Sequence, residues 1–75
     1  MNEVITVDAR YKSCPGPLIA ISEAVKNAKP KQIIKLLATD PAAPFDIKAW
    51  SESVGHKLLK ASKRNGIYEI EIEVR

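Results

Sequence analysis

The chain has 75 residues, of which 45% are hydrophobic and 28% are charged, so its composition is typical of a soluble folded domain and excludes a disordered chain. At this length we expect one domain over residues 1–75, with a core too small to enclose a deep active site. The formal net charge of +3 permits an acidic partner but is well below the basic excess of a nucleic-acid-binding protein.

The cysteine and histidine content restricts the chemistry further. The chain has one cysteine, Cys14, and one histidine, His56. These exclude an internal disulfide, a Cys-x-x-Cys redox pair and a zinc site of several thiolates, so we expect no metal and no resident cofactor. The opening residues MNEVITVDAR show no basic, apolar leader, and no apolar run is long enough to span a bilayer. We therefore expect a cytoplasmic protein without membrane contact, in which Cys14 is kept reduced.

The first half of the chain predicts a strand, a helix and a second strand. Residues 3–9 alternate between apolar and polar positions, which indicates a half-buried strand. Residues 15–28 have apolar side chains at helical spacing and predict a helix that Pro30 ends. Residues 31–38 form a short apolar run of strand length. The buried positions of the first strand and helix would be Ile5, Val7, Ala9, Leu18, Ile21, Val25 and Ala28.

The block DPAAP, residues 40–44, predicts a turn from which Pro44 opens a second helix over residues 44–54. Gly55 is placed to cap the end of that helix. Its buried face would consist of Ile47, Trp50 and Val54.

The last third of the chain predicts a hairpin. Residues 57–63 and 67–74 flank Arg64-Asn65-Gly66, and Asn-Gly is a strong signal for a tight turn. The final strand alternates Tyr68, Ile70, Ile72 and Val74 with Glu69, Glu71 and Glu73. One face of the sheet is therefore expected to be wet, with both helices on the other. The fold class is α/β, a two-layer sandwich of order β-α-β-α-β-β with a four-stranded mixed sheet. The last strand could lie at an edge, although its glutamates would discourage further pairing.

Cys14 stands where the first strand passes into the first helix. A residue before proline is kept out of the helical region, and Pro15 is suited to the first helical position, so we expect Cys14 at the N-cap. Lone cysteines are most often small buried hydrophobes. The position of Cys14, outside both apolar patterns, favours an exposed and activated thiol instead.

Several neighbours would support such a thiol. A helix N-terminus has a partial positive charge, which stabilises a thiolate and lowers the thiol pKa. Because Pro15 and Pro17 have no N–H group, the Gly16 N–H is the nearest backbone donor. Arg10 and Lys12, just upstream, would add positive charge.

Other polar residues have simpler interpretations. Asp40 and Pro41 are expected to shape the turn before the second helix, with a catalytic role for Asp40 as the less favoured reading. His56 is expected to be a solvated or satisfied histidine just beyond a helix end rather than a base for Cys14. A set of basic residues would form either a solvated edge or a docking surface for an acidic partner: Lys57, Lys60, Lys63 and Arg64.

Several motifs recur in one family in this order and spacing. They are Asp8-Ala9-Arg10, the Cys-Pro-x-Pro segment Cys14-Pro15-Gly16-Pro17, Asp40-Pro41-Ala42, Asp46-Ile47 and Gly55-His56-Lys57-Leu58. With these motifs the sequence resembles the TusA (SirA-like) family of small sulfur-carrier proteins over nearly its whole length. Tyr11 departs from the pattern, since family members commonly have glycine there. The fold implied by the resemblance agrees with the one predicted from the residues.

The resemblance implies a sulfurtransferase activity. Cys14 would accept a sulfane sulfur as a transient persulfide, or thiosulfate as a thiosulfonate, and pass it to a partner protein. The donors and acceptors implied are proteins such as DsrE-like proteins, cysteine desulfurases and rhodanese-type enzymes. Transfer RNA thiolation, molybdenum-cofactor maturation and sulfur oxidation all remain open as pathways.

Two other functions stay as alternatives. A small binding module for RNA or an acidic protein would not use Cys14, although direct nucleic-acid contact is not expected because no aromatic stacking platform is evident. A thiol or peroxide sensor would use the same low-pKa cysteine.

Overall fold

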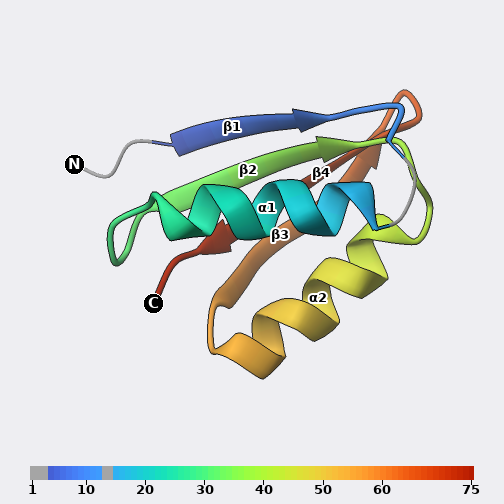
Figure 1. Ribbon diagram of the computed structural model, residues 1–75. Helices are drawn as coiled ribbons and strands as arrows, with labels where there is room; N and C mark the ends of the chain where they lie inside the picture. Colours follow the sequence, from blue (N-terminus) through green and yellow to red (C-terminus); the bar gives the residue numbers. More distant parts are fainter. Residues whose placement is uncertain (1–3, 13–14) are drawn as a thin grey trace.

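The elements follow one another in the predicted order β-α-β-α-β-β. The structure, a computed structural model, describes residues 4–12 and 15–75. Its strands and helices are β1 (Val4–Ala9), α1 (Gly16–Lys26), β2 (Ile33–Ala38), α2 (Ala43–Val54), β3 (Lys57–Arg64) and β4 (Ile67–Glu73) (Figure 1).

The strands form one four-stranded mixed sheet in the order β1-β2-β4-β3. β1 and β2 are parallel because α1 crosses between them, whereas β4 is antiparallel to both β2 and β3. Asn65 and Gly66 join β3 to β4 with φ of 52° and 78°, the two positive values that a type I′ turn requires. β4 therefore lies inside the sheet, and the possibility that the last strand forms an edge is wrong. The edges are β1 and β3.

Both helices pack on the same face of the sheet, as predicted (Figure 1). α1 packs against β1 and β2, and α2 packs against β3 and β4. The buried hydrophobic core between the layers consists of Ala9, Ile21, Ile34, Leu36, Ala38, Ala43, Ile47, Ile70, Ile72 and Val74. Burial of side chains of the Ile and Leu type contributes about 1.5–3 kcal/mol each, so this small core is the main source of stability.

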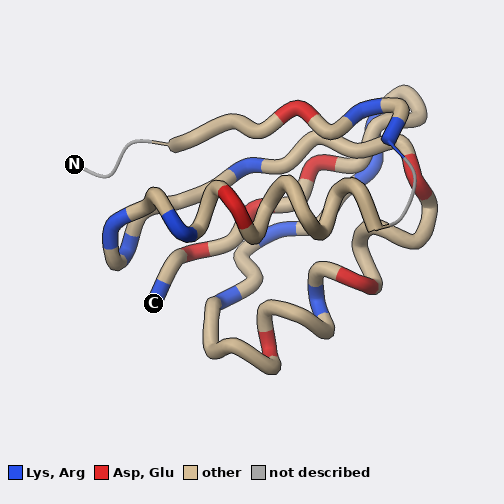
Figure 2. The backbone as a smooth tube through the Cα atoms, in the orientation of Figure 1, with Lys and Arg blue, Asp and Glu red and all other residues tan. Residues whose placement is uncertain are grey.

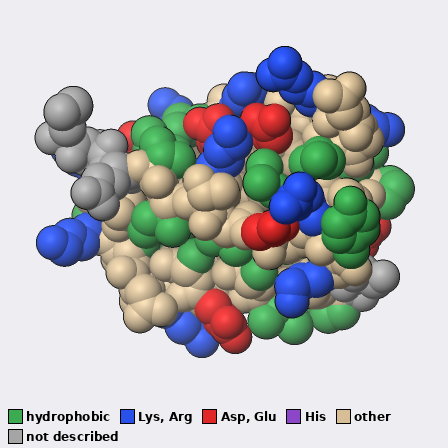
Figure 3. Space-filling view, turned by 90° about the horizontal axis from the view of Figure 1, so that it is seen from above, with side chains coloured by type: hydrophobic (Ala, Val, Ile, Leu, Met, Phe, Trp, Pro, Cys, Tyr) green, Lys and Arg blue, Asp and Glu red, His purple; other side chains and the backbone are tan. Residues whose placement is uncertain are grey.

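The opposite face of the sheet is polar and open to solvent. Lys57 and Lys60 of β3 stand opposite Glu73 and Glu71 of β4, and Lys35 of β2 stands opposite Glu71 from the other side. Opposite charges in register on one face stabilise strand pairing. Seen from above, basic and acidic side chains lie beside one another on the molecule (Figure 3). The wet face was expected from the alternating glutamates of the last strand.

The rotation of α2 differs from the prediction. Ile47 is fully buried and Trp50 packs against the core, but Val54 is 51% exposed. Ser51 is buried instead, with its hydroxyl donating to the Lys48 carbonyl oxygen at 2.9 Å. The buried stripe follows the four-residue spacing Ala43, Ile47, Ser51, and Val54 lies beside this stripe in the last helical residue.

Several element ends also differ by one or two residues, including the start of α2 at Ala43 rather than at Pro44. α1 ends at Lys26, so Ala28 lies beyond it, although Ala28 still packs against the core. β2 begins at Ile33 rather than at residue 31, because Lys31 has a φ of 70°, which no strand residue adopts.

Candidate functional site

The start of α1 is displaced by one residue from the prediction. Pro15 has φ −93° and ψ 19°, outside helical geometry, and its carbonyl oxygen accepts the Ile19 N–H at 2.9 Å. Pro15 is therefore the N-cap, and the expectation of Cys14 at that position with Pro15 inside the helix is wrong. Gly16 tolerates a helical conformation before Pro17 because it has no Cβ to meet the proline ring.

The first turn of α1 leaves few backbone donors for a neighbouring group. The first N–H groups of any helix have no intrahelical acceptor, and Pro17 has no N–H at all. Gly16 and Leu18 thus supply the donors at this end, where the helix dipole is positive. Ser13 and Cys14 lie outside the described residues, so the exposure and activation of the Cys14 thiol stay predictions. By sequence, Cys14 directly precedes the cap residue.

Lys12 and Gly16 approach each other closely across this segment. A Cβ added at Gly16 would lie 3.0 Å from the Lys12 Cβ, tighter than ordinary contacts between side chains. The stem of Lys12 therefore lies against the first helical residue, and a glycine is needed there for this approach. The structure brings these two predicted site residues together on either side of the cysteine segment.

Arg10 is held by Asp8. Its Nε and Nη2 atoms each donate to one Asp8 carboxylate oxygen at 2.9 Å, and its backbone N–H donates to Oδ1 at 3.0 Å. These hydrogen bonds lower the pKa of Asp8 to about 2, and Asp8 in turn raises the pKa of Arg10. The charge of Arg10 is compensated by its neighbour. Lys12 makes none of the ion pairs found among the described residues, although its charge also helps to lower the pKa of Asp8. Figure 2 shows the basic and acidic positions along the backbone.

Tyr11 adopts a backbone conformation that favours glycine. Its φ is 66°, its N–H donates to the Thr39 hydroxyl oxygen at 2.8 Å, and the Lys12 N–H donates to the Ala9 carbonyl oxygen at 3.3 Å. Its side chain is 86% exposed. The residue that departs from the family pattern thus occupies a turn where a side chain is strained.

Asp40 and His56 both make structural contacts. The Asp40 carboxylate accepts the Ala42 N–H at 3.0 Å, and its carbonyl oxygen accepts the Ala43 N–H at 3.0 Å, which shapes the turn into α2. His56 accepts the Arg75 N–H on Nδ1 at 3.0 Å. The centroid of the His56 ring lies 5.5 Å from that of the Trp50 ring. His56 therefore lies at the C-terminal end of α2, whereas Asp40 lies at the N-terminal end.

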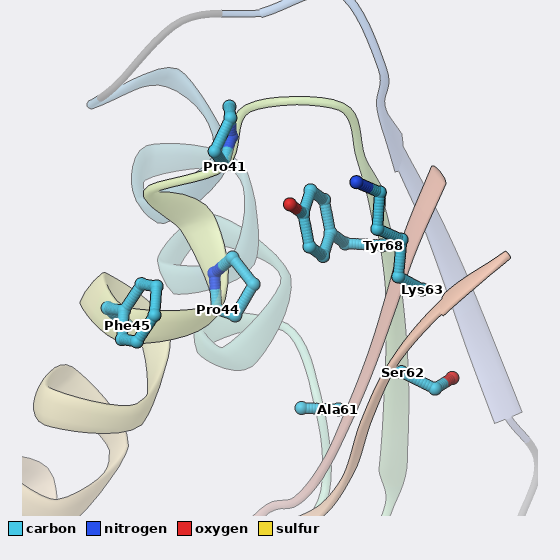
Figure 4. Close-up of a pocket in the computed structure, with 7 residues that line it drawn as sticks. All are labelled: Pro41, Pro44, Phe45, Ala61, Ser62, Lys63 and Tyr68. Atoms are coloured by element: carbon cyan, nitrogen blue, oxygen red, sulfur yellow. The ribbon is translucent and has the colours of Figure 1, made fainter. Parts of the chain in front are cut away.

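A groove of about 250 Å³ opens between the start of α2 and the β3–β4 hairpin. It is lined by Pro41, Pro44, Phe45, Ala61, Ser62, Lys63 and Tyr68 (Figure 4). Of these residues, only Pro41 and Lys63 are among the candidates predicted from the sequence. Phe45 is 76% exposed. The available signal was a large aromatic side chain between Pro44 and Asp46, outside the predicted buried face of the second helix.

Within residues 4–12 and 15–75, no group of three or more His, Asp or Glu side chains is arranged to hold a metal ion. Neither described helix has the length and apolar character needed to cross a membrane.

Comparisons with known proteins place this fold in a defined class. A solved SirA-like protein from Desulfitobacterium hafniense has the same fold, with a TM-score of 0.82 and 24% identity, over 92% of this chain and 95% of that one. Residues 5–74 match the family described as Sulfurtransferase TusA, and the chain belongs to this family.

Relatives of similar length bear names that refer to sulfur transport. The sulfur carrier protein TusA of Pseudomonas paraeruginosa is 31% identical over 62 residues, 83% of this chain and 78% of its own. A protein of Archaeoglobus fulgidus, provisionally named a sulfur carrier, is 29% identical over 70 residues, 93% of this chain and 96% of its own. In two longer relatives the chain covers 34% and 32% of the length. Membership in the family supports a sulfur-carrier role.

Proposed function

We propose that this protein is a sulfur carrier in which Cys14 accepts a sulfane sulfur as a persulfide and passes it to an acceptor protein. The observation that carries the proposal is the position of Cys14, two residues before the first residue of α1, in a chain that belongs to the TusA family. The positive end of the helix and the nearby Lys12 both favour a thiolate over a thiol at such a position.

The transfer needs no oxidant or reductant beyond the persulfide itself. The Cys14 thiolate attacks the outer sulfur of a donor persulfide, a new S–S bond forms on Cys14, and the donor leaves as a thiolate. An acceptor nucleophile then attacks the same outer sulfur, and Cys14 leaves as a thiolate. With tetrathionate the thiolate would displace thiosulfate and retain a thiosulfonate group. Both cargoes are anions that the Gly16 and Leu18 N–H groups can stabilise.

The partners of such a relay are proteins that present a persulfide or receive one. DsrE-like proteins, cysteine desulfurases and rhodanese-type enzymes are the classes we propose. The relay also requires a compartment that keeps the Cys14 thiol reduced between transfers, and the cytoplasm meets this requirement.

A turnover assay tests the proposal. The protein is loaded from a persulfide donor, freed of the donor and treated with cyanide, which removes a sulfane sulfur as thiocyanate. We expect about one thiocyanate per chain from the native protein and none from Cys14→Ser. Release at the native level from Cys14→Ser would contradict the proposal.

A relocated thiol provides the matched control. The double variant Cys14→Ser, Ser53→Cys retains one thiol but places it at an exposed position in the last turn of α2. The negative end of a helix disfavours a thiolate, so we expect this variant to load at least about tenfold more slowly than the native protein. Equal loading rates would show that the position of Cys14 has no special role.

A further inference from the structure

The groove beside α2 reaches the outer edge of β3. Three consecutive residues of β3, Ala61, Ser62 and Lys63, line it. Because side chains alternate between the two faces of a strand, three successive residues line one groove only where it reaches the backbone edge. Ala61 also remains exposed, although its partner across the sheet, Ile70, is fully buried. The helical layer therefore leaves this end of β3 uncovered (Figure 4).

The backbone of β3 offers hydrogen-bonding groups at this edge. β3 is the last strand of the sheet, so β4 pairs with one of its sides only. Arg64 stands opposite Ile67 at the two-residue turn, where the closing pair exchanges both backbone hydrogen bonds. Hydrogen-bonded and non-hydrogen-bonded pairs alternate along an antiparallel ladder, so Ala61 and Lys63 belong to non-hydrogen-bonded pairs. Their backbone N–H and C=O groups therefore point away from β4. The groove thus borders strand donors and acceptors that face outward.

The same edge is basic. β3, Lys57–Arg64, has the sequence KLLKASKR, with three lysines, one arginine and no carboxylate. Lys63 lies in the groove, where its ammonium is 5.3 Å from the centroid of the Tyr68 ring. None of the described residues that line the groove is acidic. An incoming strand with carboxylates would therefore meet complementary charge.

Size and charge together select the occupant. A groove of about 250 Å³ is smaller than typical sites for drug-sized ligands or cofactors, but it has room for one apolar side chain beside Pro44 and Phe45. A second copy of the chain would place the four cations of one β3 edge against those of another, which disfavours pairing between copies. An extended acidic segment of a different protein meets both requirements.

We propose that the β3 edge between Lys60 and Arg64 binds an extended, acidic segment of a partner protein as an added strand, with an apolar side chain of that segment in the groove. This end of the sheet also holds the starts of α1 and α2 (Figure 1). Binding at the edge uses no atom of Cys14, so it stands apart from the proposed sulfur transfer and can be tested without it.

The test uses nitrogen-15-labelled Cys14→Ser protein, which retains the β3 edge and lacks the thiol. The probe is the blocked peptide Glu-Val-Glu-Phe-Glu-Val-Glu, titrated to about 1 mM, the concentration at which weak binding is measurable. We expect amide shifts at residues 60–64 and around Phe45 and Tyr68. We also expect the outward N–H groups of Ala61 and Lys63 to exchange with solvent at least about tenfold more slowly when the peptide is bound.

Two control peptides separate the contributions. A version with Lys in place of every Glu should bind at least about tenfold more weakly, because it presents like charges to β3. A version with Pro in place of both Val residues should also lose binding, because proline cannot donate to a strand ladder. Equal binding of either control would overturn the proposal.

Two charge variants provide the matched protein control. Lys63→Glu and Lys48→Glu change the net charge equally, but Lys48 lies on the exposed side of α2, outside the groove. We expect Lys63→Glu to raise the Kd for the peptide about fivefold and Lys48→Glu to change it less than about twofold. The proposal would be overturned if the peptide caused no amide shifts at β3, or shifts centred elsewhere. It would also be overturned if oligouridylate, a single-stranded RNA titrated in the same way, bound more tightly than the peptide.

Discussion

At the scale of single residues, Tyr11 is the position where this sequence and its backbone disagree most. Its φ of 66° costs a non-glycine residue about 1–2 kcal/mol, and its exposed side chain makes little compensating contact. We predict that Tyr11→Gly raises the free energy of unfolding by about 0.5–1 kcal/mol, after allowance for the greater freedom of glycine in the unfolded chain. Urea denaturation measures the change.

Tyr11→Ala is the control for this effect, because alanine removes the ring and keeps the strained Cβ. We expect it to change stability by less than about 0.5 kcal/mol. If Tyr11→Gly proved no more stable than Tyr11→Ala, the positive φ of Tyr11 would carry no measurable cost, and the account of strain in this turn would be contradicted.

Asp8 gives a prediction on pH. Hydrogen bonds from Arg10 lower the folded-state pKa of its carboxyl to about 2. A lowered pKa in the folded state means that the stabilisation is present above the ordinary aspartate pKa of about 3.9 and is lost as the pH falls toward about 2. Carboxyl NMR titration should report a pKa near 2 for Asp8 in the native protein and a clear rise in Arg10→Ala. A native Asp8 that titrates near 4 would contradict the ion pair.

At the scale of elements, the rotation of α2 can be tested by paired truncations. Ile47 is fully buried, whereas Val54 is 51% exposed. We predict that Ile47→Ala lowers the free energy of unfolding by about 2–5 kcal/mol, because it leaves a cavity under the helix. Val54→Ala should cost less than about 1 kcal/mol. Equal losses of stability in the two variants would mean that Val54 is as buried as Ile47, as the sequence alone predicted.

The order of the elements was predictable because glycine, asparagine and proline mark the ends of the helices and strands. Asn65-Gly66 and Gly55 occupy positions that require a positive φ, and both mark the element boundaries that the structure has. The rotation of α2 was not predictable in the same way. Trp50 and Val54 fit a helical stripe as well as Ala43 and Ser51 do, and only packing on β3 and β4 decides between them.

The neighbourhood of Cys14 was predictable in part. Proline and glycine placed a helix start within one residue of its position in the structure, because their effects on the backbone are local. The approach of Lys12 to Gly16 and the groove at β3 join residues that are brought together by turns and by sheet order. The approach of Lys12 to Gly16 depends on local backbone conformation, and the groove depends on long-range packing; the apolar pattern of one segment contains neither.

At the scale of the whole molecule, the parallel pairing of β1 and β2 determines where the site lies. The carboxyl ends of parallel strands lie at the same end of a sheet, so the β1–α1 and β2–α2 connections both leave the sheet there. The first connection includes Cys14, and the second leads into the groove between α2 and the β3–β4 hairpin. The proposed sulfur-accepting segment and the proposed partner-binding edge of β3 would thus share one end of the sheet.

The most direct test of the sulfur-carrier account is an intact mass under non-reducing conditions, with the native protein and Cys14→Ser each incubated with a persulfide donor and, separately, with tetrathionate. We predict that the native protein gains the mass of one or more sulfur atoms, reversed by reductant, and that Cys14→Ser gains nothing. A thiosulfonate adduct instead of a persulfide would assign the protein to thiosulfate handling. A folded native protein that forms neither adduct would contradict the account.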